Sequence, residues 1–185
     1  MPWRLRDSLS GGFTILEVVL ALVLLAGALS GVARLLTVSF AAARQARTQT
    51  STTLLAVQKL EQLRSLTWAV DESGSPQSDL GTDLSVDPPA GGGTGLQASP
   101  GNALAQNLPG YVDHLGSRGE WVGAGASVPA GAVYTRRWSI EPLAEDPADT
   151  LVLQVVVTAA PRSGAAADRL PGDARLTTVV TRKSR

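Results

Sequence analysis

The sequence predicts an α+β fold in which a long N-terminal helix packs, through its C-terminal half, on a small antiparallel sheet. Three observations predict it. Residues 13–33 are apolar or small except for Glu17, no proline occurs between Pro2 and Pro76, and three β-rich segments follow in the last third of the chain. A chain of 185 residues has room for one domain and an anchoring element.

The apolar segment from Phe13 to Ala33 is long enough to cross a bilayer. Its 21 residues form about 30 Å of helix, which matches the thickness of the hydrocarbon core. Basic residues lie on both sides of it, so charge alone does not decide its orientation. They are Arg4 and Arg6 before the segment, and Arg34, Arg44 and Arg47 after it.

Glu17 is the one charge inside this segment, and it admits three interpretations. An ordinary signal peptide cut after Ser30 or Ala33 leaves the carboxylate unexplained, and a permanent single-pass anchor only tolerates it near one end. Cleavage between Gly12 and Phe13 explains it, because the new α-amino group at Phe13 would lie one helical turn from Glu17. Across a bundle of helices, pairing of the two charges in a low dielectric would fix the axial register.

The string Gly12-Phe13-Thr14-Ile15-Leu16-Glu17-Val18 resembles the class III leader of type IV prepilins and type II secretion pseudopilins. The resemblance implies cleavage after Gly12 by a prepilin peptidase, N-methylation of Phe13 and a register-setting role for Glu17. It implies a pilin-like fold and a single-pass protein of the bacterial inner membrane, with its head outside, that later enters a pilus or pseudopilus at the cell surface. The implied partners are the peptidase, the lipid bilayer before assembly, other pilin or pseudopilin subunits and the inner-membrane assembly platform.

Under this interpretation the chain has five parts. These are a cleaved leader (1–12), a transmembrane and assembly helix (13–34), its amphipathic continuation (35–67), a Gly/Pro-rich loop region (68–131) and the sheet of a globular head (132–185).

The helix is expected to run from Phe13 to about Leu66 and to present an apolar stripe to the sheet. The stripe consists of Leu55, Ala56, Leu60, Leu63 and Leu66. Lys59 falls inside this stripe, and we expect its stem to pack there while its ammonium group reaches outward to solvent.

Three segments, 132–141, 150–159 and 174–182, predict an antiparallel meander whose apolar face, with Tyr134 and Trp138, covers the stripe. The adjacent Arg136 and Arg137 should face opposite ways in their strand. The region 68–131 is too long for a passive connection, so part of it should be ordered. Tyr111, Trp121 and Val122 are the expected sources of short strand or packing contacts there.

Nothing in the sequence forms a persuasive catalytic set, and we expect neither enzymatic activity nor a metal or cofactor. The chain has no cysteine, which excludes disulfides and thiolate sites. His114, the only histidine, is interpreted as a solvated loop residue. Asp79, Asp83 and Asp87 are spaced like calcium ligands but lack an EF-hand loop. The tail Arg182-Lys183-Ser184-Arg185 is interpreted as solubilising, with weak contact to DNA or anionic lipid as the lesser option.

The function expected from the resemblance is that of a minor subunit of a type IV pilus, of the PilV type, which supports pilus initiation and assembly, adhesion, twitching motility or DNA uptake. A minor pseudopilin of a type II secretion system is the alternative within the same architecture. An exported or membrane-anchored binding domain, with an ordinary signal peptide or anchor, is the alternative of a different class.

Overall fold

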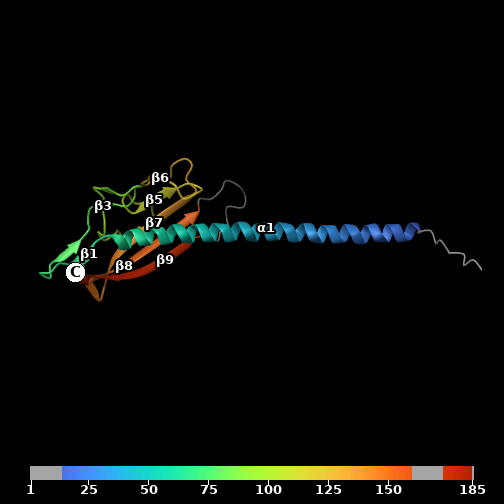
Figure 1. Ribbon diagram of the computed structural model, residues 1–185. Coiled ribbons are helices and arrows are strands. Elements are labelled where there is room, and N and C mark those ends of the chain that lie inside the picture. The colour runs from blue at the N-terminus through green and yellow to red at the C-terminus, as the bar shows by residue number, and fades with distance from the viewer. Residues whose placement is uncertain (1–13, 160–172, 185) are drawn as a thin grey trace, which may run out of the picture. The chain divides into compact units, whose positions relative to one another are not determined.

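The computed structural model describes residues 14–159 and 173–184. The fold is α+β: one long helix, α1 (Ile15–Ser65), precedes the strands (Figure 1). The strands are β1 (Trp68–Val70), β2 (Pro76–Ser78), β3 (Thr82–Asp83), β4 (Ala90–Gly91), β5 (Val112–Leu115), β6 (Trp121–Ala124), β7 (Tyr134–Leu143), β8 (Asp146–Ala159), β9 (Ala174–Thr181) and β10 (Lys183–Ser184). The chain divides into two compact units between Arg44 and Gln45, and α1 contributes to both.

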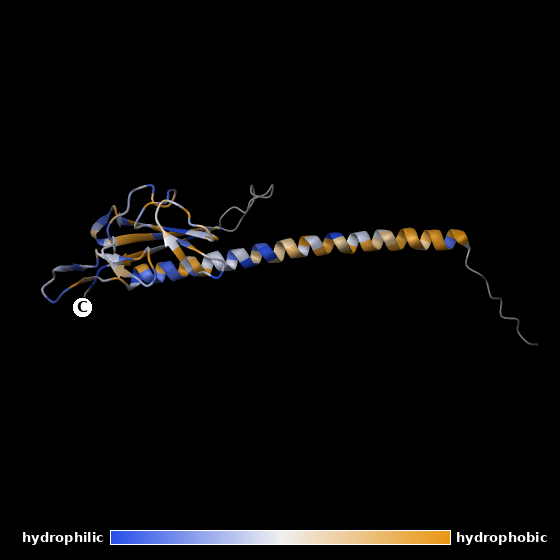
Figure 2. Ribbon diagram, turned by 90° about the horizontal axis from the view of Figure 1, so that it is seen from above, coloured by the Kyte–Doolittle hydropathy of each residue, from blue (hydrophilic) through white to orange (hydrophobic). Residues whose placement is uncertain are grey.

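Helix α1 confirms the predicted helix, which was expected to end near Leu66. It ends at Ser65, where the Leu66 amide donates to the Leu63 carbonyl at 3.3 Å and the chain turns into β1. Figure 2 shows the change of character along it, from almost continuously apolar in the first half to mixed in the second. An uninterrupted helix is expected, because no proline removes a donor within these residues.

The main sheet has five strands in the order β6-β5-β7-β8-β9, and every neighbouring pair is antiparallel. The predicted meander is confirmed as β7, β8 and β9. The residues between the predicted strands 132–141 and 150–159 are also mostly strand, because β7 and β8 continue to a tight turn with Leu143 opposite Asp146. Residues 146–149 are exposed at this tip, so their polar side chains stay solvated while the backbone keeps its ladder.

Strands β5 and β6 extend the sheet from within the region 68–131. Shorter pairings order more of that region: β1 pairs with β2 and, in parallel, with β10, and β3 pairs with β4. The expectation that part of the region is ordered is therefore confirmed. The expected short strand and packing contacts are found: Trp121 and Val122 lie in β6, and Tyr111 is buried in the core. The other short strands were not expected, because two to four residues give no readable alternation.

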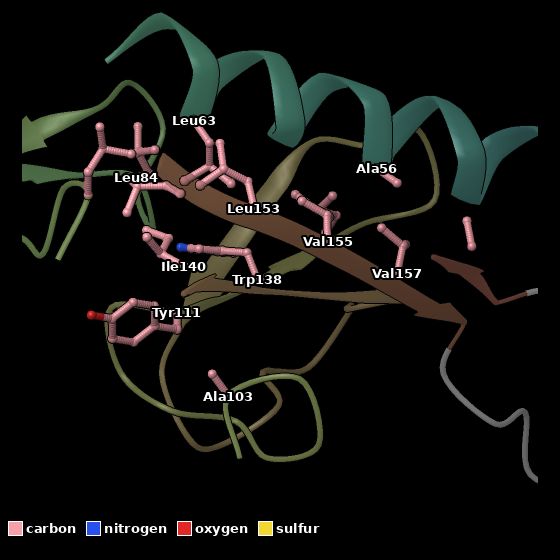
Figure 3. Packing of buried hydrophobic residues seen from close by; sticks show 14 of the residues in the cluster. Ala56, Leu63, Leu84, Ala103, Tyr111, Trp138, Ile140, Leu153, Val155 and Val157 are labelled. Carbon is pink, nitrogen blue, oxygen red and sulfur yellow. The ribbon is translucent and has the colours of Figure 1, made fainter. Parts of the chain in front are cut away.

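The hydrophobic core lies between the C-terminal half of α1 and the sheet (Figure 3). Ala56 and Leu63 of the predicted stripe are buried, and they share one cluster with Trp138 of β7 and with alternate residues of β8. The β8 members are Leu151, Leu153, Val155 and Val157. Full burial of a Leu or Val side chain contributes about 1.5–3 kcal/mol, so this contact is the main reason for the helix to stay on the sheet.

Lys59 does not reach solvent, and that prediction is wrong. Its side chain is 1% exposed, its Nζ forms an ion pair with Asp113 Oδ2 at 2.9 Å, and it donates to the Leu84 carbonyl at 2.6 Å. The ammonium also lies 4.4 Å from the centroid of the Trp138 ring. The correction follows from β5, which brings a carboxylate under the helix where the sequence suggested only loop.

Arg136 of β7 shares the same carboxylate. Its Nε donates to Asp113 Oδ1 at 2.9 Å and its Nη2 to Oδ2 at 2.7 Å, while Nη1 reaches the Leu55 carbonyl at 3.1 Å. Its neighbour Arg137 donates instead to Asn107 at 2.8 Å, so the expectation that the two arginines face opposite ways is confirmed. Lys59, Asp113 and Arg136, called the buried charge cluster below, tie α1 to β5 and β7.

His114 is not a solvated loop residue. It lies in β5, is fully buried, and its ring nitrogens lie 3.2 Å from Thr135 Oγ1 and 3.0 Å from the Gly125 carbonyl. Both nitrogens have partners, so the ring acts as a hydrogen-bonded part of the core.

The interpretation of the tail as solubilising is wrong for Arg182. Its guanidinium lies 3.6 Å from the Trp68 ring centroid and forms an ion pair with Asp149 at 3.1 Å. It also donates to the Ala69 and Ala148 carbonyls. Lys183 alone of these basic residues is described and exposed. The C-terminal edge is therefore fastened by arginine contacts.

Replacing Asp113 by alanine should lower the free energy of unfolding by about 3–5 kcal/mol, because two buried cations would lose their common partner. Urea unfolding of the full-length chain in detergent, followed by tryptophan fluorescence, measures this. The control is Asp149→Ala, which removes a carboxylate that is 60% exposed and should cost less than about 1 kcal/mol. Equal losses in the two variants would contradict the role assigned to the buried charge cluster.

The pH dependence of stability should carry a signature of Lys59. Burial is the main cause that lowers the pKa of Lys59 from 10.5 to about 8; the neighbouring Asp113 opposes this and Arg136 adds to it. Between these two pH values the unfolded chain binds a proton that the folded chain has lost, so the Lys59 contribution to stability rises with pH, by up to about 3 kcal/mol.

The measurement is the difference in unfolding free energy between the native chain and Lys59→Met, from about pH 7.5 to about pH 9.5. Tyr111, whose pKa burial raises, titrates above this window. Lys183→Met, at an exposed position, is the control. A difference that falls with pH would show that the ion pair with Asp113 outweighs the desolvation of Lys59.

Candidate functional site

Glu17 lies in the first turn of α1, and its side chain is exposed. Thr14 precedes the helix as its N-cap: its Oγ1 accepts the Glu17 amide at 3.2 Å, and its carbonyl accepts the Val18 amide at 3.2 Å. Thr14 and Glu17 have the Thr-x-x-Glu spacing of a capping box, and the helix dipole favours an anion at this end.

The capping role of Thr14 was missed in the sequence, although the Thr-x-x-Glu spacing was present. The observed bond joins the Thr14 hydroxyl to the Glu17 backbone amide, so it does not depend on the side chain at position 17. A glutamine at this position of a capping box would also serve, so the helix dipole is the local reason for a charge there.

The other two predicted site residues, Gly12 and Phe13, lie outside the described residues. Cleavage after Gly12, methylation of Phe13 and the register role of Glu17 stay predictions.

The first half of α1 presents an apolar surface on every side. All side chains from Thr14 to Arg47 are exposed, and the large apolar ones from Ile15 to Phe40 are each at least 47% exposed. A helix that is apolar all round is stable only when something buries it. The helix is long and apolar enough to cross a membrane.

Hydroxyl side chains within this surface donate hydrogen bonds to carbonyls of their own helix. Ser30 Oγ donates to the Ala26 carbonyl at 2.8 Å, and Thr37 Oγ1 donates to the Arg34 carbonyl at 2.7 Å. Hydroxyl groups bonded back to their own helix are compatible with an apolar surrounding. The charged residues between Ile15 and Ala43 are Glu17 and Arg34, and the structure shows no ion pair of either with another described residue.

The carboxylates spaced like calcium ligands serve turns instead. Asp79 accepts the Gly81 and Thr82 amides and the Thr82 hydroxyl, and this last bond is the main cause that lowers the pKa of Asp79. Asp83 accepts the amide and the hydroxyl of Ser85. Among the described residues, no group of three acidic, His or Cys side chains is close enough to share a metal ion.

A cleft of about 550 Å³ lies where the last turns of α1 meet β1 and β9. Leu66, Trp68 and Val180 are among its lining residues, and two of its charged residues, Glu61 and Arg64, form an ion pair with each other at 2.8 Å. The described lining contains no nucleophile paired with a base, so the cleft has no chemistry that we can assign.

No protein-family model matches the chain, and no curated protein and no solved structure is significantly similar to it.

Proposed function

We propose that this chain is a minor subunit of a type IV pilus, processed by a prepilin peptidase and assembled through the first half of α1. One observation carries the proposal: α1, whose first half is apolar and exposed on every side, begins next to a Gly12-Phe13 junction and carries a single carboxylate in its first turn. The pilin-like arrangement, a long N-terminal helix with its C-terminal half on a small sheet, agrees with it.

The apolar surface supports two successive environments. In the bilayer, lipid covers the helix all round, which suits side chains that are apolar on every face. In a filament, the same faces would be covered by neighbouring helices, which exchange lipid contacts for side-chain packing. A helix with one polar face would suit neither environment.

Glu17 supports cleavage at Gly12 because its charge then acquires a partner. A cut before Phe13 creates an α-amino group four residues from Glu17 in sequence, and residues at this spacing share a helix face. A neighbouring subunit could offer the same amine. An unpaired carboxylate in an apolar surrounding costs about 2.5–3.5 kcal/mol, so assembly would favour the register that pairs it.

The first test is the mass of the mature N-terminus of protein from its native membrane. We expect the chain to begin at Phe13 and to carry one added methyl group. A bulky Gly12→Leu variant, which should block the peptidase, is the control and should keep its leader. A start after Ser30 or Ala33 would indicate an ordinary signal peptide, and an intact Met1 a permanent anchor; either result would contradict the proposal.

Glu17→Gln separates the charge from the capping contact. The variant keeps an oxygen for the helix N-terminus, so cleavage should be unchanged, but its incorporation into sheared pili should fall at least about tenfold, the effect of losing about 1.4 kcal/mol. Immunoblots of sheared and membrane fractions measure this. The matched control, Glu61→Gln, neutralises an exposed glutamate of the same helix and should assemble normally.

Normal assembly of Glu17→Gln would show that the charge is not needed for register. Twitching and pilus number should fall together with incorporation while secretion of folded proteins is unchanged. The opposite pattern would identify the chain as a type II secretion pseudopilin.

A further inference from the structure

Arg34 is the second charge on the apolar surface, and neither capping nor prepilin processing accounts for it. Glu17 and Arg34 have opposite signs, both side chains are exposed, and the sixteen residues between them are uncharged. The two residues cannot pair within one helix. Seventeen positions separate them by about 26 Å along the axis and by about 100° around it.

The spacing is compatible with a bilayer, whose hydrocarbon core is about 30 Å thick. With residues 18–33 in the hydrocarbon, Glu17 and Arg34 lie near opposite interfaces, where each charged group can reach water. Copies of the chain inserted side by side at one depth would keep their Glu17 and Arg34 side chains at different levels. In that state, the two charges do not meet.

We propose that Arg34 of one copy binds Glu17 of a second copy that is displaced outward along the helix axis by about 26 Å. This inference rests on the proposed function, because such a displacement requires the second copy to leave the bilayer as assembly proceeds. The pair then marks the axial offset between two subunits. A copy that has not been lifted, or has been lifted by another distance, leaves both charges without partners.

A second copy is the occupant that the charges favour. It offers an apolar helix of matching length whose carboxylate is complementary to Arg34, and the two charged faces differ, so the contact between two copies is head-to-tail. Gly27 and Gly31 lie on the Arg34 side of the helix. A Cβ added at either would meet nothing within 4 Å, so a neighbouring backbone has room to approach there.

The pairing with Arg34 and the pairing with the Phe13 amine are compatible. A carboxylate has two oxygens and accepts bonds from more than one cation, as Asp113 does for Lys59 and Arg136 in this chain. Two cations on one carboxylate would define the register more sharply than either alone.

Single-cysteine cross-linking can test the offset, since the native chain has no cysteine. Leu24 and Ala41 each lie seven residues after a charge, Glu17 and Arg34 respectively, and so on the same face as that charge. Two differently tagged full-length copies, Leu24→Cys and Ala41→Cys, are produced together in the native host, and sheared filaments are oxidised. We expect the mixed disulfide to exceed the in-register Leu24→Cys homodimer at least about tenfold.

Substitution of Arg34 tests the pair itself. Arg34→Gln should reduce the mixed disulfide at least about tenfold and Arg34→Lys should keep it, whereas Arg47→Gln, at an exposed position of the same helix, should leave it unchanged. An unchanged amount of the Arg34→Gln chain in the membrane fraction shows that this variant inserts normally.

The outcomes separate the two proposals. Filaments that contain the chain but give only in-register disulfides, or none between copies, would overturn the staggered pair and leave the pilus assignment intact. The same holds if Arg34→Gln leaves the mixed disulfide unchanged. Absence of the processed native chain from sheared filaments would overturn both.

Discussion

Asp113 is the carboxylate that forms ion pairs with both cations buried between α1 and the sheet. Lys59 approaches it from the helix and Arg136 from β7, and the side chains of all three residues are at most 5% exposed. Burial of charge is costly unless every partner is present, so only one placement of α1 on β5 and β7 satisfies the cluster. That placement also sets Ala56 and Leu63 over Trp138 and the apolar residues of β8 (Figure 3). Apolar burial supplies the attraction, and the cluster restricts it to a single register.

The two halves of α1 meet the need for burial in different ways. From Thr52 onward, the helix buries a stripe on its own sheet, and the opposite face carries polar residues such as Glu61 and Arg64. Before Arg47 its side chains are exposed on every face, so no other described part of the chain covers them. This difference is the physical basis of the proposed function. In the proposed function, the first half is a surface for lipid and then for other helices, and Glu17 and Arg34 are the features on it that would distinguish one neighbour position from another.

The C-terminal strands β9 and β10 are held to the rest of the fold by side-chain contacts of Arg182, in a chain without cysteine. Arg182 lies between the end of β9 and the start of β10. Its guanidinium stacks on Trp68 and bonds to both Asp149 and the Ala69 carbonyl. Its side chain is 7% exposed, and it joins the small sheet of β10, β1 and β2 to the β7–β8 hairpin. A planar guanidinium with five donors suits such a junction, because it can stack and bond in several directions at once.

The sequence by itself determined the features that depend on neighbours a few residues away. The length of α1, its apolar surface, the stripe with Ala56 and Leu63, and the β7-β8-β9 meander all follow from local periodicity and from the absence of proline. The Gly12, Phe13 and Glu17 pattern came from the sequence too, and only Glu17 lies among the described residues. Tertiary structure decided the buried Lys59, the core position of His114, the contacts of Arg182 and strand β5. Each of these depends on a partner far away in sequence. A polar side chain is buried only when folding brings a carboxylate, a carbonyl or a ring next to it, and the local sequence pattern does not indicate which distant residue this partner is.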